Sequence, residues 1–359
     1  MKTVTFVYPI VPNHPIGGLK VVLDYANYLA ANGIQVYIVY AAYFKQTDCC
    51  SGKFIKSILK FLYSFYRRFV RCSWFRVDSR VKEKYVWELG PMNIPQADAY
   101  IATSANSAIY IDQLNVPKEK KFYFIQHFET FILPANEVLK TYRYGLRKIV
   151  IAQWLKKIVE EQGQSCVVVP NGFHFDEFKI TLPIEKKNKQ LISMLYHESA
   201  AKDFATGLEA VKIVKSRNPE LTVLLFGVYK KPSTLPSWIK YYHNPDHKEH
   251  LNINNSAAIY VGSSKTEGWG LTVGEAMMCG QAVVCTANDG YMEMAVDGRN
   301  ALLSPTGNPQ MLADNICKLQ SDDSLRIQLA NQGVKDIAQF DLNKSYKKFY
   351  DALELHCES

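Results

Sequence analysis

Long apolar runs are missing from this sequence of 359 residues. No stretch reaches the roughly 18 uninterrupted apolar residues that a membrane-spanning helix needs. Residues Met1 to Thr3 lead directly into a strand-like segment, without the pattern of a secretory signal peptide. We therefore expect a cytoplasmic protein.

Metal-binding and disulfide patterns are missing as well. The eight cysteines include no Cys-x2-Cys pair and no cluster with histidine, so the sequence indicates neither a zinc site nor a disulfide framework. We expect reduced thiols, several of them buried. Hydrophobic residues make up 48% of the chain and charged residues 21%, which is ordinary for a globular protein and excludes wholesale disorder.

Acidic residues are missing from one segment, and this explains most of the net charge. The chain has 42 Lys and Arg against 34 Asp and Glu, a formal charge of +8. Between Cys49 and Val77 there are no carboxylates and seven cations, namely Lys53, Lys56, Lys60, Arg67, Arg68, Arg71 and Arg76. A single local basic feature is therefore favoured over a general nucleic-acid surface, and no nucleic acid is expected as a partner.

The basic segment has the pattern of an amphipathic helix. From residue 53 to 72 the apolar side chains recur with a period of about 3.6 residues, and most of the cations lie off this stripe. Two interpretations remain open. In the first, the cations bind anionic headgroups and attach the protein to the inner membrane face, through Lys53, Lys56, Lys60, Arg67, Arg68 and Arg71. In the second, the stripe packs on its own domain and the cations face water.

The rest of the chain alternates between short apolar runs and helical patterns. Strand-like runs at 4–8 and 36–40 flank a helical pattern, which predicts a βαβ unit. Further strand-like runs occupy 99–102, 122–125, 149–152 and 166–169, and a second series occupies 191–195, 222–226, 258–261 and 282–285. The predicted fold class is α/β with two Rossmann-like domains, at 1–180 and 191–338, joined by a polar linker at 181–190 and followed by a helical segment at 339–359.

A glycine-containing turn follows one strand of the second series. Gly268 and Gly270 allow close approach of a ligand to the backbone, and a helix that begins near Leu271 offers unpaired N–H groups that suit a phosphate. Glu267 and Glu275 stand at either end, and carboxylates accept hydrogen bonds from sugar hydroxyls. A diphosphate with a sugar on each side would fit this arrangement.

This segment resembles the Glu-x7-Glu signature of retaining family-4 glycosyltransferases, which have the GT-B architecture of two Rossmann-like domains around a central cleft. Other stretches resemble family motifs in the family's order: Gly17-Gly18, Pro170-Asn171-Gly172, and the tail from Thr286 to Leu303. The resemblance implies transfer of a hexose or deoxyhexose from a nucleotide-diphosphate sugar to a glycan or lipid-linked acceptor, in cell-surface polysaccharide biosynthesis. It also implies a C-terminal helix that returns to the first domain.

The resemblance also assigns roles to single residues. Glu275 matches the glutamate that binds the nucleotide ribose, Glu267 the one that contacts the donor sugar, and His127 a first-domain histidine near the transferred sugar. The residues matched to donor binding further include Gly17, Gly18, Lys202, Gly268, Trp269, Gly270 and Leu271. Lys202 fits the family's phosphate-binding lysine, but His197 stands where the family usually has arginine, and an imidazole is the weaker phosphate ligand.

We expect no metal and no cofactor, because Asp-x-Asp, the pair typical of metal-bridged diphosphate binding in the other major glycosyltransferase architecture, does not occur. Two rival interpretations remain open beside transfer. One is a GT-B epimerase that acts on a nucleotide sugar. The other is a catalytically silent homologue that acts as a scaffold, which the replacement at His197 leaves open.

Overall fold

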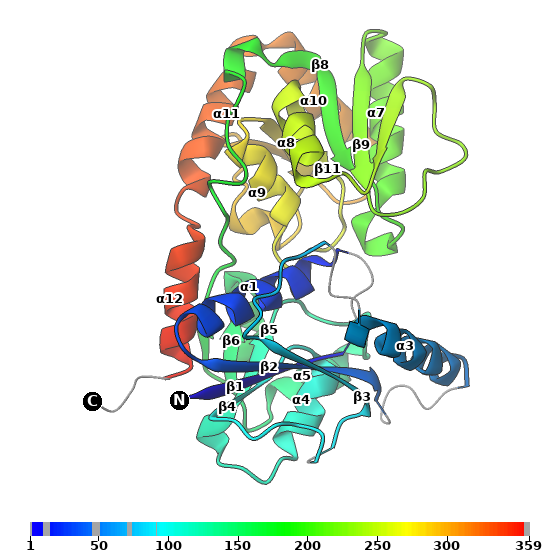
Figure 1. Ribbon diagram of the computed structural model, residues 1–359. Helices are drawn as coiled ribbons and strands as arrows, with labels where there is room; N and C mark the ends of the chain where they lie inside the picture. Colours follow the sequence, from blue (N-terminus) through cyan, green and yellow to red (C-terminus); the bar gives the residue numbers. More distant parts are fainter. Residues whose placement is uncertain (1, 10–14, 45–50, 70–73, 91, 355–359) are drawn as a thin grey trace. The chain divides into compact units, whose positions relative to one another are not determined.

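The computed structural model describes residues 2–9, 15–44, 51–69, 74–90 and 92–354 (Figure 1). The chain divides into two compact units. The first comprises Met1–Asn171 together with Asn343–Ser359, and the second comprises Gly172–Leu342.

The first unit is built on a parallel sheet with the strand order β3-β2-β1-β4-β5-β6-β7. Its strands are β1 (Thr3–Tyr8), β2 (Gln35–Tyr43), β3 (Lys82–Glu88), β4 (Ala99–Ala102), β5 (Lys121–Ile125), β6 (Arg147–Val150) and β7 (Cys166–Val168). Its helices are α1 (Gly17–Ala31), α3 (Ser51–Phe69), α4 (Ala105–Asp112), α5 (Ala135–Tyr142) and α6 (Gln153–Glu161). The central strands are almost wholly buried, because helices connect parallel strands and cover both faces of the sheet.

The C-terminal helix α12 (Leu342–Ala352) completes the core of the first unit. The Phe349 ring stacks on Tyr25 of α1 with 4.1 Å between centroids and also contacts Phe6 of β1 and Phe124 of β5. The predicted return of the C-terminal helix to the first domain is therefore confirmed, within residues 342–352.

The second unit has a parallel sheet with the order β10-β9-β8-β11-β12-β13, which is the 3-2-1-4-5-6 order of a dinucleotide-binding fold. Its strands are β8 (Asn188–Leu195), β9 (Thr222–Gly227), β10 (Ile239–His243), β11 (Ala257–Gly262), β12 (Ala282–Thr286) and β13 (Ala301–Ser304). Its helices are α7 (Phe204–Arg217), α8 (His247–Ser256), α9 (Leu271–Met278), α10 (Pro309–Ser321) and α11 (Asp323–Ile337). The predicted α/β class with two Rossmann-like domains is confirmed.

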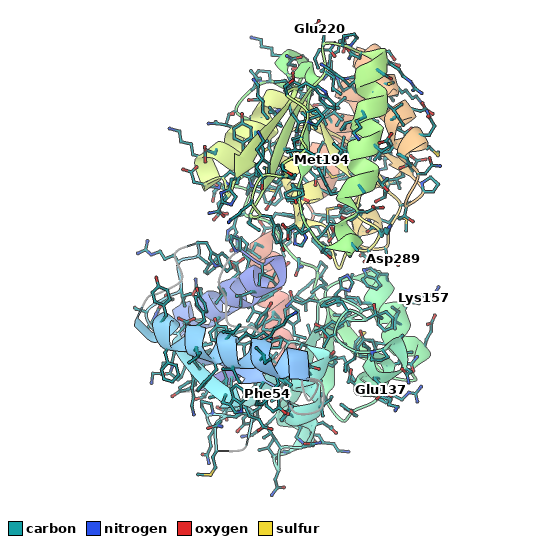
Figure 2. All side chains as sticks on the ribbon, turned by 90° about the vertical axis from the view of Figure 1, so that its right-hand side faces the viewer. Phe54, Glu137, Lys157, Met194, Glu220 and Asp289 are labelled. Atoms are coloured by element: carbon teal, nitrogen blue, oxygen red, sulfur yellow. The ribbon has the colours of Figure 1, made fainter. Side chains whose placement is uncertain are left out.

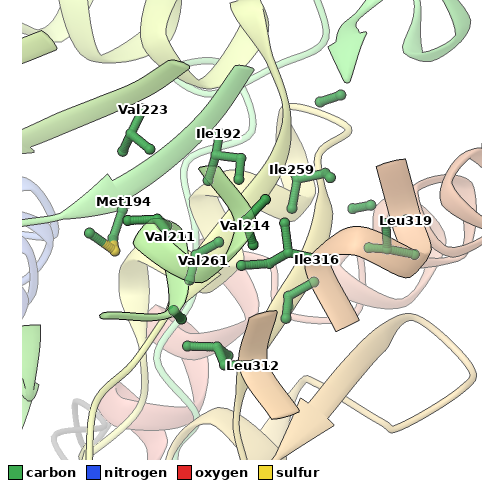
Figure 3. Close-up of a cluster of buried hydrophobic side chains, with 14 of the residues drawn as sticks. Ile192, Met194, Val211, Val214, Val223, Ile259, Val261, Leu312, Ile316 and Leu319 are labelled. Atoms are coloured by element: carbon green, nitrogen blue, oxygen red, sulfur yellow. The ribbon is translucent and has the colours of Figure 1, made fainter. Parts of the chain in front are cut away.

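The main core of the second unit lies between the sheet and the helices α7 and α10 (Figure 3). Ile259 and Val261 of β11 point into this cluster. Tyr260, between them, points to the opposite face, where its hydroxyl donates to Thr272 Oγ1 of α9 at 2.7 Å. The alternation of β11 therefore places α9 on the face opposite α7 and α10.

The predicted linker at 181–190 is wrong, because the chain passes from the first unit to the second at Asn171 and Gly172. Residues 181–190 belong to the second unit, where Ile184 is buried and β8 begins at Asn188. Lys187 is buried too, and its amine donates to the carbonyls of Asn254 and Asn255 at 3.1 and 2.7 Å. The lysine-rich composition therefore misled the prediction, since one of these lysines binds carbonyl groups at the end of α8.

The basic segment forms a helix, α3, as predicted. Only one edge of its apolar stripe packs against the domain, where the Phe54 ring contacts Trp87 at 5.8 Å between centroids. Ser57 and Ser64 are buried, whereas Ile55, Leu59 and Leu62 are exposed. Of the predicted membrane-contact residues, Lys56 is exposed and Lys60 half-buried. The side chains of Lys53, Arg67 and Arg68, and the whole of Arg71, lie outside the described residues. The described part of the chain contains no helix long and apolar enough to cross a membrane.

Candidate functional site

The candidate site of the second unit lies at the carboxyl ends of its strands. Glu220, just before β9, and Asp289, just after β12, lie at opposite ends of this unit (Figure 2). The neighbours β8 and β11 are the strands at which the order of the sheet reverses, and ligands of such sheets bind outside the carboxyl ends at this point. The predicted residues follow these two strands: Lys202 comes after β8, and Glu267 to Leu271 come after β11.

The turn before α9 depends on two glycines. Gly270 caps α9 with φ of 103°, and a Cβ there would lie 2.6 Å from Tyr291 Cδ1. A Cβ on Gly290 would lie 2.5 Å from the Glu267 carbonyl oxygen. The backbone of the turn therefore lies so close to the Tyr291 segment that only glycine fits at these two positions. The first N–H groups of α9, as at any helix start, have no partner within the helix and suit an anion. Trp269 points away into the core, against Phe340 at 5.1 Å.

Glu267 and Lys202 form an ion pair in the centre of the site. Lys202 Nζ donates to both carboxylate oxygens of Glu267, at 2.7 and 2.8 Å, and the Glu267 side chain is only 10% exposed. The Ser264 hydroxyl donates to Glu267 Oε1 at 2.7 Å, and the Tyr291 hydroxyl lies 3.4 Å from the same oxygen. An ammonium has three N–H donors, so Lys202 can keep both of these bonds and still donate to a phosphate oxygen.

Glu275 lies one turn into α9 and faces a buried histidine of α8. His250 Nε2 is 4.0 Å from Glu275 Oε2, and the imidazole packs between the rings of Phe178 and Phe226. Burial, and secondarily the neighbouring His247, lowers the pKa of His250 to about 4. The histidine therefore stays neutral near pH 7.

The His197 imidazole contacts the Ser199 backbone and the Tyr229 side chain. The backbone N–H of Ser199 donates to His197 Nδ1 at 2.9 Å, so this nitrogen keeps its lone pair and Nε2 carries the proton. Nε2 faces the Tyr229 hydroxyl at 3.3 Å, and the two rings are 4.8 Å apart. The position at which the resembled family has a fixed cation therefore holds an imidazole whose Nδ1 accepts a hydrogen bond.

The remaining predicted residues lie in the first unit. His127 follows β5, and its ring contacts Phe131 and Trp154, while Nδ1 lies 3.0 Å from the Phe128 carbonyl. This carbonyl can only accept, so Nδ1 carries the proton and Nε2 is the basic nitrogen. Gly17 and Gly18 are the first two residues of α1 rather than part of the preceding loop. The Gly18 carbonyl accepts from the Gln126 amide at 3.1 Å, which joins the start of α1 to the end of β5.

A buried carboxyl group lies two residues beyond His127. Glu129 accepts from the backbone N–H of Ala105 at 2.5 Å, at the start of α4. Burial raises the pKa of Glu129 to about 8, and the Ala105 hydrogen bond only partly opposes this. The first unit thus holds a carboxyl group that is mostly protonated at neutral pH.

The structure brings together Lys202, Glu267 and the start of α9, and it places Glu275 on the same helix. His250 and Tyr291 were not predicted as site residues, because a single histidine or tyrosine within a helix or loop has no spacing pattern. The sequence offered one signal for Tyr291, its place within the tail from Thr286 to Leu303. In the described part of the chain, no group of three His, Cys, Asp or Glu side chains is arranged to hold a metal ion.

Comparison with known proteins agrees with this geometry. Residues 175–336 match the family model of glycosyl transferases group 1. HepE from Anabaena, solved in complex with UDP-glucose, aligns with 99% of this chain and 100% of its own with a TM-score of 0.73, at 15% sequence identity. The two-unit architecture is therefore the GT-B fold.

Two curated relatives are similar over part of the chain. One is the N,N'-diacetylbacillosaminyl-diphospho-undecaprenol alpha-1,3-N-acetylgalactosaminyltransferase of Campylobacter jejuni, 32% identical over 104 residues, which are 28% of each chain. The other is the phosphatidyl-myo-inositol mannosyltransferase of Mycobacterium tuberculosis, 23% identical over 197 residues, 51% of this chain and 52% of the relative. The matches thus span about half or less of these relatives.

The chain has the GT-B fold, a helix N-terminus that suits a phosphate and a carboxylate beside that N-terminus. These features define a broad class of folds that bind nucleotide sugars. Within that class, residues 175–336, which make up almost the whole second unit, match the family of glycosyl transferases group 1.

Proposed function

We infer that this protein transfers a hexose or deoxyhexose from a nucleotide-diphosphate sugar to a glycan or lipid-linked acceptor, with retention of configuration and without a metal. The observation that carries this proposal is the Lys202–Glu267 pair beside the start of α9, at the carboxyl ends of β8 and β11. UDP-glucose is the first donor to test, since HepE was solved with it. The names of the two curated relatives favour a lipid-linked or lipid acceptor.

In the proposed mechanism the residues of the second unit stabilise the leaving group. The third N–H of Lys202 and the N–H groups at the start of α9 donate to the diphosphate, where negative charge develops as the glycosidic C–O bond breaks. Glu267 accepts a hydrogen bond from the donor sugar, and Glu275 accepts from the ribose diol. The acceptor oxygen attacks from the face that the diphosphate leaves, and a phosphate oxygen takes the acceptor's proton.

His127 is proposed as the first-unit contact of the transferred sugar. Its Nδ1 proton is held by the Phe128 carbonyl, so the basic Nε2 is the atom that can accept a hydrogen bond from a sugar hydroxyl. Gly17 and Gly18, at the start of α1, are proposed to let the donor approach the backbone of the same unit.

The test begins with donor binding and ends with the product. A bound donor at 100 times its dissociation constant should stabilise the fold by about 2.7 kcal/mol. We expect this stabilisation with UDP-glucose or another nucleotide sugar, and we expect Glu275→Gln to abolish it. Glu209→Gln, on the exposed side of α7, is the matched control. NMR of the product should then show the anomeric configuration of the donor.

A second candidate function is nucleotide-sugar binding without transfer, and the histidine at position 197, in place of a fixed cation, favours it. Lys202 contacts Glu267, and its charge is shared with that carboxylate. Donor binding without release or transfer of sugar, over a panel of glycan and lipid-linked acceptors, would support this candidate. Absence of binding to every nucleotide-diphosphate sugar would exclude both functions.

A further inference from the structure

The side of α3 that faces its own unit carries two serines and two phenylalanines, and most of the apolar stripe of the helix faces away from that unit. Ser57 and Ser64 are 0% and 1% exposed, and the neighbouring Phe61 ring contacts Trp87 of β3 at 5.6 Å between centroids. A helix at the surface of a globular unit normally does the reverse and buries its apolar stripe. The exposed apolar side chains of α3 therefore suit an apolar environment outside their own unit.

The outer side of α3 is a continuous apolar stripe. Ile55, Leu59, Leu62 and Tyr66 follow each other at intervals of four, three and four residues, and they are 59%, 61%, 58% and 56% exposed. At 100° per residue this stripe lies roughly 180° from Ser57 and Ser64. Seven of the 14 large hydrophobic side chains that are exposed in the described residues belong to this helix. Figure 2 shows α3 on the side of the first unit that faces the viewer, with Phe54 labelled.

Positive charge borders this stripe. Lys56 is exposed and Lys60 half-buried, and by the same geometry they lie roughly 90° and roughly 130° around the helix from the centre of the stripe. By sequence, α3 also contains the cations Lys53, Arg67 and Arg68. There is no Asp or Glu between residues 49 and 77. A protein partner would need only the apolar stripe, whereas cations along its edge without any carboxylate match the anionic headgroups that border the acyl region of a bilayer.

We propose that α3 docks the protein on an anionic lipid bilayer. The helix lies in the plane of the interface, with Ile55, Leu59, Leu62 and Tyr66 at the acyl boundary and with Lys56 and Lys60 among the headgroups. The bilayer thus covers the side of α3 that its own unit leaves exposed. This proposal rests on α3 alone and stands whether or not the proposed sugar transfer is correct.

Vesicle flotation tests the proposal. The full chain should float with vesicles of equal parts phosphatidylcholine and phosphatidylglycerol, should stay behind with phosphatidylcholine alone, and should be released by high salt. Leu59→Ser combined with Leu62→Ser should lower the partition coefficient at least about tenfold, because both side chains leave the acyl boundary. Lys56→Glu combined with Lys60→Glu should remove most of the preference for the anionic lipid.

The matched control uses two exposed apolar residues of the second unit. Met311→Ser combined with Val296→Ser removes side chains that are as apolar and nearly as exposed as those of the stripe, and flotation should not change. The stripe residues are more than half exposed, so we expect the α3 variants to fold, which thermal unfolding and unchanged nucleotide-sugar binding would verify. Equal flotation of the wild type and the Leu59/Leu62 variant would overturn the proposal.

A depth measurement separates insertion from electrostatic adsorption. In the Leu62→Trp variant, brominated acyl chains should quench the added indole, whereas Met311→Trp should be quenched no more than the wild type. Absence of extra quenching at residue 62 would overturn the insertion of the stripe. A dimer in light scattering that the Leu59/Leu62 variant loses, together with no flotation, would assign the stripe to a second copy of the chain and would also overturn the proposal.

Discussion

Lys202 is the residue on which the proposed chemistry depends most. Its amine is held by both oxygens of Glu267, so it is positioned before any donor binds. Lys202→Ala removes the cation that would meet the leaving diphosphate, and we expect turnover to fall about 10²–10³-fold, as for the loss of other preorganised donors to a developing charge. Lys212→Ala, which removes an exposed lysine paired with Glu209, should leave turnover unchanged. Steady-state kinetics with the identified donor measures both, and equal turnover of the two variants would contradict the role of Lys202.

His197 offers the opposite test, a gain of charge. Its Nδ1 accepts from the Ser199 N–H, so this nitrogen offers no donor to a phosphate. His197→Arg would introduce a permanent cation with several donors, which suits phosphate better. We expect the dissociation constant of the nucleoside diphosphate to fall about fivefold to tenfold. This change corresponds to about 1 kcal/mol, the energy of an ion pair near the protein surface. Titration calorimetry measures it. Unchanged or weaker binding would show that position 197 does not face the diphosphate.

Glu129 predicts a pH dependence of stability. Its pKa of about 8 lies above the ordinary value of 4.5, so the folded state binds more protons than the unfolded state between these two pH values. The stability that comes from the protonated carboxyl is complete below about pH 4.5 and is lost as the pH rises through about 8. The groups that face Glu129 are the hydroxyls of Tyr8, Tyr123 and Tyr142, which burial keeps neutral over this range.

The Glu129→Gln variant removes this titration and can still accept from the Ala105 N–H. We therefore expect the variant to gain stability relative to the wild type as the pH is raised from 5 to 9. Urea unfolding at several pH values measures the difference between the two proteins. A constant difference across the range would show that the Glu129 carboxyl is ionised throughout.

Among the elements, α9 depends most on a single backbone conformation. At Gly270→Ala we expect two costs: about 1–2 kcal/mol for an alanine at positive φ, and about 1–3 kcal/mol for the clash with the Tyr291 ring. Gly307 has φ of 71° but open space around it, so Gly307→Ala should show only the first cost. Thermal unfolding of both variants isolates the steric part, and the Gly270 variant should also lose nucleotide affinity. Equal losses of stability would contradict the close packing of the turn on Tyr291.

The sequence predicts the interior elements well and the edges poorly. The strands 99–102 and 282–285 are apolar throughout because both faces are covered, and the structure has strands there. Three of the four edge strands, β3, β10 and β13, were missed, whereas the edge strand β7 was predicted. β3 and β10 carry polar residues such as Lys82 and Lys240, which break the apolar pattern. Periodicity predicted the α3 helix but cannot say which face turns inward, so its exposed stripe emerged only from the structure. For the same reason, the packing of His250 against Glu275 could not be foreseen.

At the scale of the whole molecule, the chain crosses between the two units twice, and the second crossing adds α12 to the core of the first. Phe349 is fully buried among Phe6, Tyr25 and Phe124, so Phe349→Ala leaves a cavity that should cost about 3–5 kcal/mol. Because the lost contacts all belong to the first unit, the loss should be local. Hydrogen exchange should speed up in β1 and β5 while β9 and β12 keep their protection, and Lys348→Ala, on the exposed side of α12, should change neither. Uniformly faster exchange in both sheets would instead mean that the two units unfold as one cooperative structure.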